Sequence, residues 1–127
     1  MQEQRITFNT AKLAKEKEFD VLCEHSFSEH DSGIQDNNQN GFRNLNKEYK
    51  NSYSRPTQTL LQKWLREVYN THLMVEPYYN EQKLLVYGFD LITERTEEET
   101  IVEKGFKTYE EALEVGLHEA LKLIKNK

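Results

Sequence analysis

Apolar residues recur every three or four positions in two stretches of the chain, and each stretch is expected to form an amphipathic helix. The first covers residues 57–69 and follows Pro56, a residue type that is well tolerated in the first turn of a helix. Its apolar face is expected to contain Leu60, Leu61, Trp64, Leu65 and Val68. Because Trp64 lies within the leucine stripe, we expect it in the core, and a surface role in ligand stacking is the less favoured alternative.

The last helix is expected over residues 109–124, and Thr108 and Glu111 mark its start as a capping box. The stripe expected to face the core is formed by Tyr109, Leu113, Gly116, Leu117, Ala120 and Ile124. Glycine costs about 1 kcal/mol relative to alanine inside a helix, so Gly116 on this stripe indicates a close approach to a neighbouring backbone.

Between these helices the pattern changes to an alternation of apolar and polar residues, which is typical of half-buried strands. Three strands are expected, at residues 72–78, 84–92 and 100–106, the last of them after an acidic turn at residues 93–99. In the first strand Leu73 and Val75 lie on one side, and the other side carries His72, Met74 and Glu76. Both helices need a common apolar surface, so the pattern predicts an α+β fold with a three-stranded antiparallel sheet covered on one face.

The N-terminal part has weaker patterns. A short helix capped by Thr7 or Asn9 is expected within residues 1–25, and its narrow apolar face would need the main core to persist. Residues 26–54 are dominated by polar side chains and are expected to form a long flexible loop, either solvated or used as a binding surface. The chain is expected to be one domain, residues 1–127, whose core is the helix-sheet-helix unit of residues 55–127.

The formal net charge of −5 comes mostly from the second half of the chain, which has thirteen acidic and nine basic residues after Pro56, against nine and eight up to it. Polyanions such as duplex nucleic acid are therefore not favoured partners. A single cysteine, Cys23, excludes an internal disulfide framework and fits a reducing compartment. No apolar run has the length of a membrane span and the first residues lack the apolar segment of a signal peptide, so a cytoplasmic protein without membrane association is expected.

One run combines side chains that bind metals or act in catalysis: Cys23, Glu24, His25, Glu29, His30 and Asp31. Thiolate and imidazole are good zinc ligands, but the spacing is irregular and no second cysteine is present. The favoured interpretation is a semi-buried Cys23 followed by a polar loop, and a nucleophilic Cys23 paired with His25 or His30 is weaker still. We therefore expect no metal, no cofactor and no enzymatic activity.

The order helix, three antiparallel strands, helix in residues 56–127 resembles the double-stranded-RNA-binding domain fold. In that family, basic residues at the start of the last helix and a polar loop after the first strand grip the RNA backbone. Here Lys107 is followed by Thr108, Tyr109, Glu110 and Glu111, so only one cation stands where several are needed. The resemblance implies the topology, whereas the charges at these positions argue against duplex binding.

Three segments resemble a family of small uncharacterised proteins of gut Bacteroides and their phages: TAKLAKEKEFD, PTQTLLQKWLREVYN and TYEEALEVGLHEALKLI. The segment that begins at Pro56 is the most specific of the three. The resemblance implies an intracellular protein of phage or mobile-element type, and it brings no activity, cofactor or set of functional residues.

Two classes of function follow from these patterns. The first is a non-enzymatic protein-interaction module that uses the predicted loop with Tyr78 and Tyr79, or the strand face with His72, Met74 and Glu76, because aromatic residues at an exposed turn suit a protein interface. The alternative is weak nucleic-acid binding by Lys63 and Arg66, helped by the lysines of the first helix, which are Lys12, Lys15 and Lys17. Neither class fixes the partner or the oligomeric state.

Overall fold

The computed structural model describes residues 3–93 and 96–124, and for residues 39–40 and 96–103 it describes the backbone alone. The fold is α+β, with helices and antiparallel sheets as predicted. The elements are α1 (Phe8–Glu16), β1 (Cys23–His30), β2 (Gly33–Arg43), α2 (Leu45–Glu48), β3 (Ser52–Ser54), α3 (Gln58–Tyr69), β4 (His72–Tyr79), β5 (Leu85–Thr93), β6 (Thr96–Phe106) and α4 (Tyr109–Lys122).

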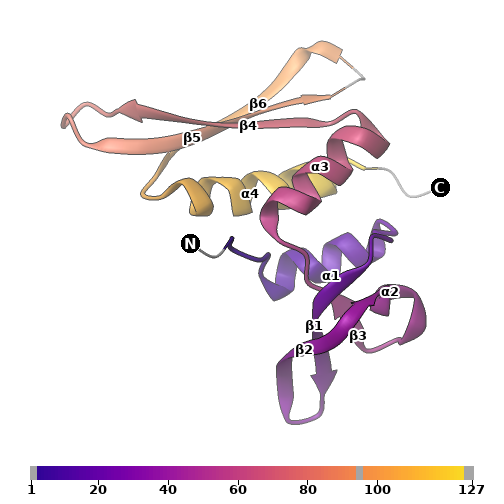
Figure 1. The fold of residues 1–127 in the computed structure, drawn as a ribbon. Coiled ribbons are helices and arrows are strands. Elements are labelled where there is room, and N and C mark those ends of the chain that lie inside the picture. The colour runs from indigo at the N-terminus through magenta and orange to yellow at the C-terminus, as the bar shows by residue number, and fades with distance from the viewer. Residues whose placement is uncertain (1–2, 94–95, 125–127) are drawn as a thin grey trace.

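The larger sheet has the strand order β4-β5-β6, and all of its pairs are antiparallel. Helix α4 runs along one face of this sheet with α3 beside it, and no helix or strand of the described residues lies over the other face (Figure 1). Leu73, Phe89 and Leu91 point toward the helices and are buried. The third strand begins at Thr96, so part of the predicted acidic turn at residues 93–99 belongs to β6 instead.

Helix α3 begins one residue later than predicted, because Thr57 is its cap and its Oγ1 accepts a hydrogen bond from Leu60 N at 3.2 Å. Trp64 is buried, as the leucine stripe predicted, and packs edge-on against Phe19 with 5.2 Å between ring centroids. Val68 is 57% exposed, so its predicted place in the core was wrong. The buried stripe is narrower than the apolar pattern, since it consists of Gln58, Leu61, Trp64 and Leu65.

The start of α4 confirms the predicted cap, because Thr108 Oγ1 accepts from Glu111 N at 3.1 Å. Gly116 is buried and does permit a close approach, although to side chains rather than to a backbone. A Cβ atom at this position would lie 2.5 Å from Leu73 Cδ1 and 3.2 Å from Phe89 Cγ. Tyr109 is 42% exposed, so its predicted burial was wrong. At the first residue of the helix it lies beside Tyr87, with 6.2 Å between the ring centroids.

Residues 26–54 are not the predicted loop. They contain most of β1, all of β2, α2 and β3, and these strands form a second antiparallel sheet of order β2-β1-β3. The turn between β1 and β2 uses Gly33 at φ +128°, a conformation that residues with a Cβ rarely adopt. Phe27 and Tyr53 are paired across β1 and β3, and the ring of Phe8 packs edge-on against both.

Helix α1 lies between α4 and the smaller sheet (Figure 1). Its Ala11 and Ala14 are fully buried, and one hydrophobic core joins them to Phe27 and Tyr53 on one side and to Leu117 and Leu121 on the other. The helix thus docks on the main core, as predicted. The order from α3 to α4 is helix, three strands, helix, but the described residues before α3 form three further strands, so the predicted overall order and the likeness to the double-stranded-RNA-binding fold are not confirmed.

The predicted cap of α1 is replaced by a contact with α4. Thr7 is the cap residue, but its side chain makes no capping hydrogen bond to a backbone amide of α1, and its Oγ1 lies 3.3 Å from Thr10 Oγ1. Instead the Glu114 carboxylate accepts hydrogen bonds from Thr7 N at 3.1 Å, from Thr7 Oγ1 at 3.0 Å and from Thr10 Oγ1. Its second oxygen accepts from Gln58 Nε2 at 3.1 Å, so one carboxylate ties together three helices.

Among the described residues, none of the helices has both the length and the apolar character that crossing a membrane requires.

Candidate functional site

The face of the larger sheet that carries no helix is the most distinctive surface of the protein, and we call it the open face. In antiparallel strands, directly paired residues point to the same side, so the registers Met74 with Asp90, Glu76 with Gly88, and Gly88 with Lys104 define this face. The described side chains on this face are His72, Met74, Glu76 and Tyr78 from β4, Val86, Asp90 and Ile92 from β5, and Lys104 from β6.

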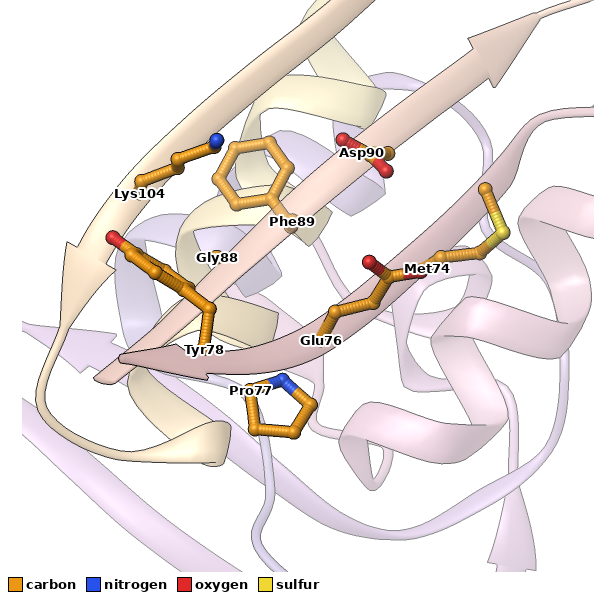
Figure 2. Close-up of a pocket in the computed structure, with 8 residues that line it drawn as sticks. All are labelled: Met74, Glu76, Pro77, Tyr78, Gly88, Phe89, Asp90 and Lys104. Atoms are coloured by element: carbon orange, nitrogen blue, oxygen red, sulfur yellow. The ribbon is translucent and has the colours of Figure 1, made fainter. Parts of the chain in front are cut away.

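A small hollow lies in the middle of the open face, above Gly88 (Figure 2). It has a volume of about 100 Å³ and is lined by Met74, Glu76, Pro77, Tyr78, Gly88, Phe89, Asp90 and Lys104. Gly88 contributes no side chain, so the central strand leaves a gap between its two neighbours. Figure 2 shows Tyr78 and Lys104 at one end of the hollow and Met74 and Asp90 at the other.

The hollow combines an aromatic ring with charges of both signs. The Lys104 ammonium lies 5.6 Å from the centroid of the Tyr78 ring, within the range of a cation–π interaction. Glu76 and Asp90 are its two carboxylates, and neither forms an ion pair with a side chain that the structure describes. The hollow therefore has two acidic groups and one basic group.

The size of the hollow limits what it can hold. Sites for small-molecule ligands usually enclose about 300–1,000 Å³, and a water molecule occupies about 30 Å³ of the liquid. About 100 Å³ suits the tip of one side chain rather than a whole metabolite. None of the lining residues is a cysteine, serine or histidine.

The sequence pattern predicted that Tyr78 and Tyr79 lie in a loop, and this was wrong. The structure places both residues at the end of β4. The actual turn follows at Asn80, whose Oδ1 accepts hydrogen bonds from Gln82 N and Leu84 N, both at 3.0 Å. Tyr78 belongs to the open face and lines the hollow, whereas Tyr79 alternates to the other side and is 73% exposed. The two tyrosines thus do not form one aromatic surface.

Three of the four lysines proposed for nucleic-acid contact have partners within the fold. Lys63 is exposed on α3, and its ammonium lies 3.9 Å from the Glu67 carboxylate. The Lys15 ammonium donates to the carbonyl oxygens of Tyr49, Lys50 and Ser52 at 2.6–2.9 Å. Lys17 donates to the carbonyl of Ile124 at 2.7 Å, just beyond the end of α4.

Arg66 and Lys12 are exposed, and among the described residues neither has an ion pair. The structure therefore leaves only part of the predicted cationic set available to a phosphate.

The cysteine and histidine run lies in β1, where successive side chains point to opposite faces of the strand. Cys23 is buried, and this burial raises the pKa of its thiol to about 11, so the thiol is protonated near neutral pH. His30 Nε2 lies 3.0 Å from Ser28 Oγ, at the exposed end of the strand. Among the described residues, no three of the His, Cys, Asp and Glu side chains are grouped so as to hold a metal ion.

A second cavity, of about 280 Å³, lies where the N-termini of α3 and α4 meet. Its lining consists of Glu3, Gln4, Gln58, Thr59, Tyr109, Glu110 and Leu113. Two helix N-termini would favour an anion, but the lining has two glutamates and no cation, so these effects oppose each other.

Three residues of the hollow were missed from the sequence: Gly88, Asp90 and Lys104. A glycine inside an apolar strand was the available signal, because it often marks a point where another group approaches the backbone. Asp90 and Lys104 join Met74 and Tyr78 around the hollow only through strand register, which the sequence pattern does not contain.

No protein-family model matches the chain, and neither the curated proteins nor the solved structures include a match to it. The predicted relationship to proteins of Bacteroides and their phages therefore stays a prediction, and functional argument rests on the geometry of the open face.

Proposed function

We propose that this protein is a non-enzymatic protein-interaction module that contacts its partner through the open face. The observation that carries the proposal is the exposure of apolar side chains on the uncovered side of the larger sheet. Met74 is 39% exposed and Ile92 is 42% exposed, and Tyr78 lies half-buried between them and the end of the sheet. Methionine and tyrosine are both enriched at the centres of protein interfaces.

The arrangement of polar and apolar groups also supports a protein partner. An antiparallel sheet with one solvated face needs only polar side chains on that face, and the apolar residues here have no role in the core. Charged groups stand among them, as expected for a contact surface that must remain compatible with water when unoccupied.

Nucleic-acid binding has less support as an alternative. Lys15 and Lys17 donate hydrogen bonds to backbone carbonyls, and Lys63 lies beside Glu67. These three cations therefore already have partners within the fold. Phosphate binding requires several cations acting together. The open face itself contains acidic residues, which would repel a phosphate backbone.

The experiment is affinity capture from lysate with the tagged full-length chain. The test variant combines Met74→Ala with Tyr78→Ala, both on the open face. The matched control combines Phe42→Ala with Tyr49→Ala, two exposed aromatic residues in the part of the chain that carries the smaller sheet. We expect a partner that is captured by the unaltered chain and by the control but is lost with the test variant. Equal capture by all three proteins would contradict the use of the open face.

A further inference from the structure

The charged groups of the hollow are arranged around a gap. Glu76, Gly88 and Lys104 form one row across the three strands, and Asp90 lies two positions along β5 from Gly88. Glu76 and Asp90 are therefore diagonal neighbours on the same face, a relation that places Cα atoms about 7–8 Å apart. Two carboxylates at this separation repel each other, and a cation placed between them would relieve the repulsion.

The Lys104 ammonium does not supply that cation. It forms no ion pair with Glu76 or Asp90, and it lies instead over the ring of Tyr78. Its position indicates that the exposed surface of the ring is accessible to a positive group. The hollow thus offers a cation an aromatic surface, an apolar edge formed by Met74, and two carboxylates that have no ion pair with the side chains that the structure describes.

We infer that the hollow accepts an arginine side chain of the protein partner. This inference rests on the proposed function and names the chemistry of the partner at its central contact. A guanidinium group is planar and can stack on the Tyr78 ring while its several N–H donors reach two carboxylates, whereas an ammonium acts as a single point charge. A volume of about 100 Å³ fits one such side-chain tip.

The charge balance favours a single added cation. The hollow has two carboxylates and one ammonium, so one arginine makes it neutral. Lys104 has to move away from Tyr78 to allow stacking, which means that this lysine competes with the incoming group. Removing the charge of Lys104 is therefore expected to strengthen arginine binding, while removing either carboxylate weakens it.

The test is a nuclear magnetic resonance titration of the isotope-labelled full-length chain with N-acetyl-arginine amide. N-acetyl-citrulline amide is the neutral control of nearly the same shape, and N-acetyl-lysine amide compares the two cations. The protein variants are Glu76→Gln, Asp90→Asn and Lys104→Gln. The matched control is Glu67→Gln, which neutralises an exposed glutamate on α3, away from the open face. Preserved spectra away from the substituted residue establish that each variant remains folded.

We expect saturable shifts with the arginine probe at the amides of residues 74–78 and 88–90, and none with the citrulline probe. Each carboxylate substitution should weaken binding roughly two- to fivefold, as for an exposed ion pair, while Lys104→Gln strengthens it and Glu67→Gln leaves it unchanged. Equal binding of the citrulline probe, or unaltered affinity in both carboxylate variants, would overturn the inference. Tighter binding of the lysine probe would overturn the choice of arginine.

These outcomes are separable from those of the capture experiment. Suppose that a partner is lost with the variant that combines Met74→Ala and Tyr78→Ala, but the arginine probe does not bind. This result refutes the inference and leaves the proposed function standing. Binding of the probe in the hollow without any such partner refutes the proposed function and leaves a cation site on the open face.

Discussion

Replacement of Glu114 by alanine is expected to destabilise the protein far more than replacement of a typical surface glutamate. The Glu114 carboxylate accepts four hydrogen bonds, from Thr7 N, Thr7 Oγ1, Thr10 Oγ1 and Gln58 Nε2. It also lies at the start of α1, where a negative charge interacts favourably with the helix dipole. Its loss would affect the contact between α1, α3 and α4 at once.

The expected loss in the free energy of unfolding follows from the hydrogen-bond donors that Glu114→Ala would leave without their acceptor. Gln58 Nε2 keeps a second acceptor, the carbonyl of Glu110 at 3.0 Å, and Thr7 is exposed enough to bind water. The hydroxyl of Thr10 is the main loss, because this residue is buried and would keep only the long contact of 3.3 Å with Thr7 Oγ1, and a buried donor without a good partner costs about 1–3 kcal/mol. With the weaker contributions of the other donors, we expect a decrease of about 2–4 kcal/mol in the free energy of unfolding.

The assay is equilibrium unfolding in urea, followed by the fluorescence of Trp64, the single tryptophan of the chain. With a slope of about 2 kcal/mol per molar urea, the transition midpoint should fall by about 1–2 M. Glu67→Ala is the matched control, since that exposed residue has only an ion pair with Lys63, worth about 0.5 kcal/mol at most. A loss for Glu114→Ala no larger than that of the control would refute the assigned network.

Three further outcomes can be measured with the same protein. Gly116→Ala should lower the free energy of unfolding, measured in urea, by about 1 kcal/mol. Overpacking against Leu73 and Phe89 costs about 1–3 kcal/mol, whereas the gain in helix propensity is about 1 kcal/mol. A more stable variant would contradict this packing. Alkylation of Cys23 by iodoacetamide at pH 8 should be about 100-fold slower in the native chain than in the unfolded chain. The reason is that burial raises the thiol pKa from 9.0 to about 11, which lowers the fraction of reactive thiolate. Equal rates would mean that the thiol is exposed. Labelled duplex RNA and DNA should bind weakly at low salt and not measurably at physiological salt, because few cations are available together; submicromolar affinity at physiological salt would refute this.

The second half of the fold could be predicted because its burial follows simple periods. Leu61, Trp64 and Leu65 recur at helical spacing, and Leu73, Phe89 and Leu91 lie at alternating positions of strands. Helix and strand periods identify which residues face the core, but not where neighbouring elements end. This is why Val68 and Tyr109, at the ends of their helices, were assigned to the core and are exposed.

The smaller sheet escaped prediction for a different reason. Strands β1 and β2 consist largely of Ser, Asn, Gln, Asp, Glu and His, which are rare in the interior of sheets, and only a few aromatic residues attach the sheet to the core. Polar side-chain contacts, which the apolar pattern does not reveal, also hold the smaller sheet in place. Arg55 donates to the carbonyl of Ile6 at 3.0 Å and to Asp36 at 2.6 Å, and its guanidinium lies over the ring of Phe27. Such contacts join distant segments and leave no periodic signal in the sequence.

The position of α1 has a consequence for the folding of the chain during its synthesis. Thr7 and its partner Glu114 are 107 residues apart in the sequence, so the buried alanines of α1 lack their covering helix until α4 has been made. At a synthesis rate of about 5–20 residues per second, this interval lasts roughly 5–20 s. During that time the growing chain presents an unpaired apolar helix and a partly supported sheet, which are the features that chaperones bind and proteases cleave. The packing of α1 is thus completed only after α4 has been synthesised, so the N-terminal segment cannot reach its native contacts alone.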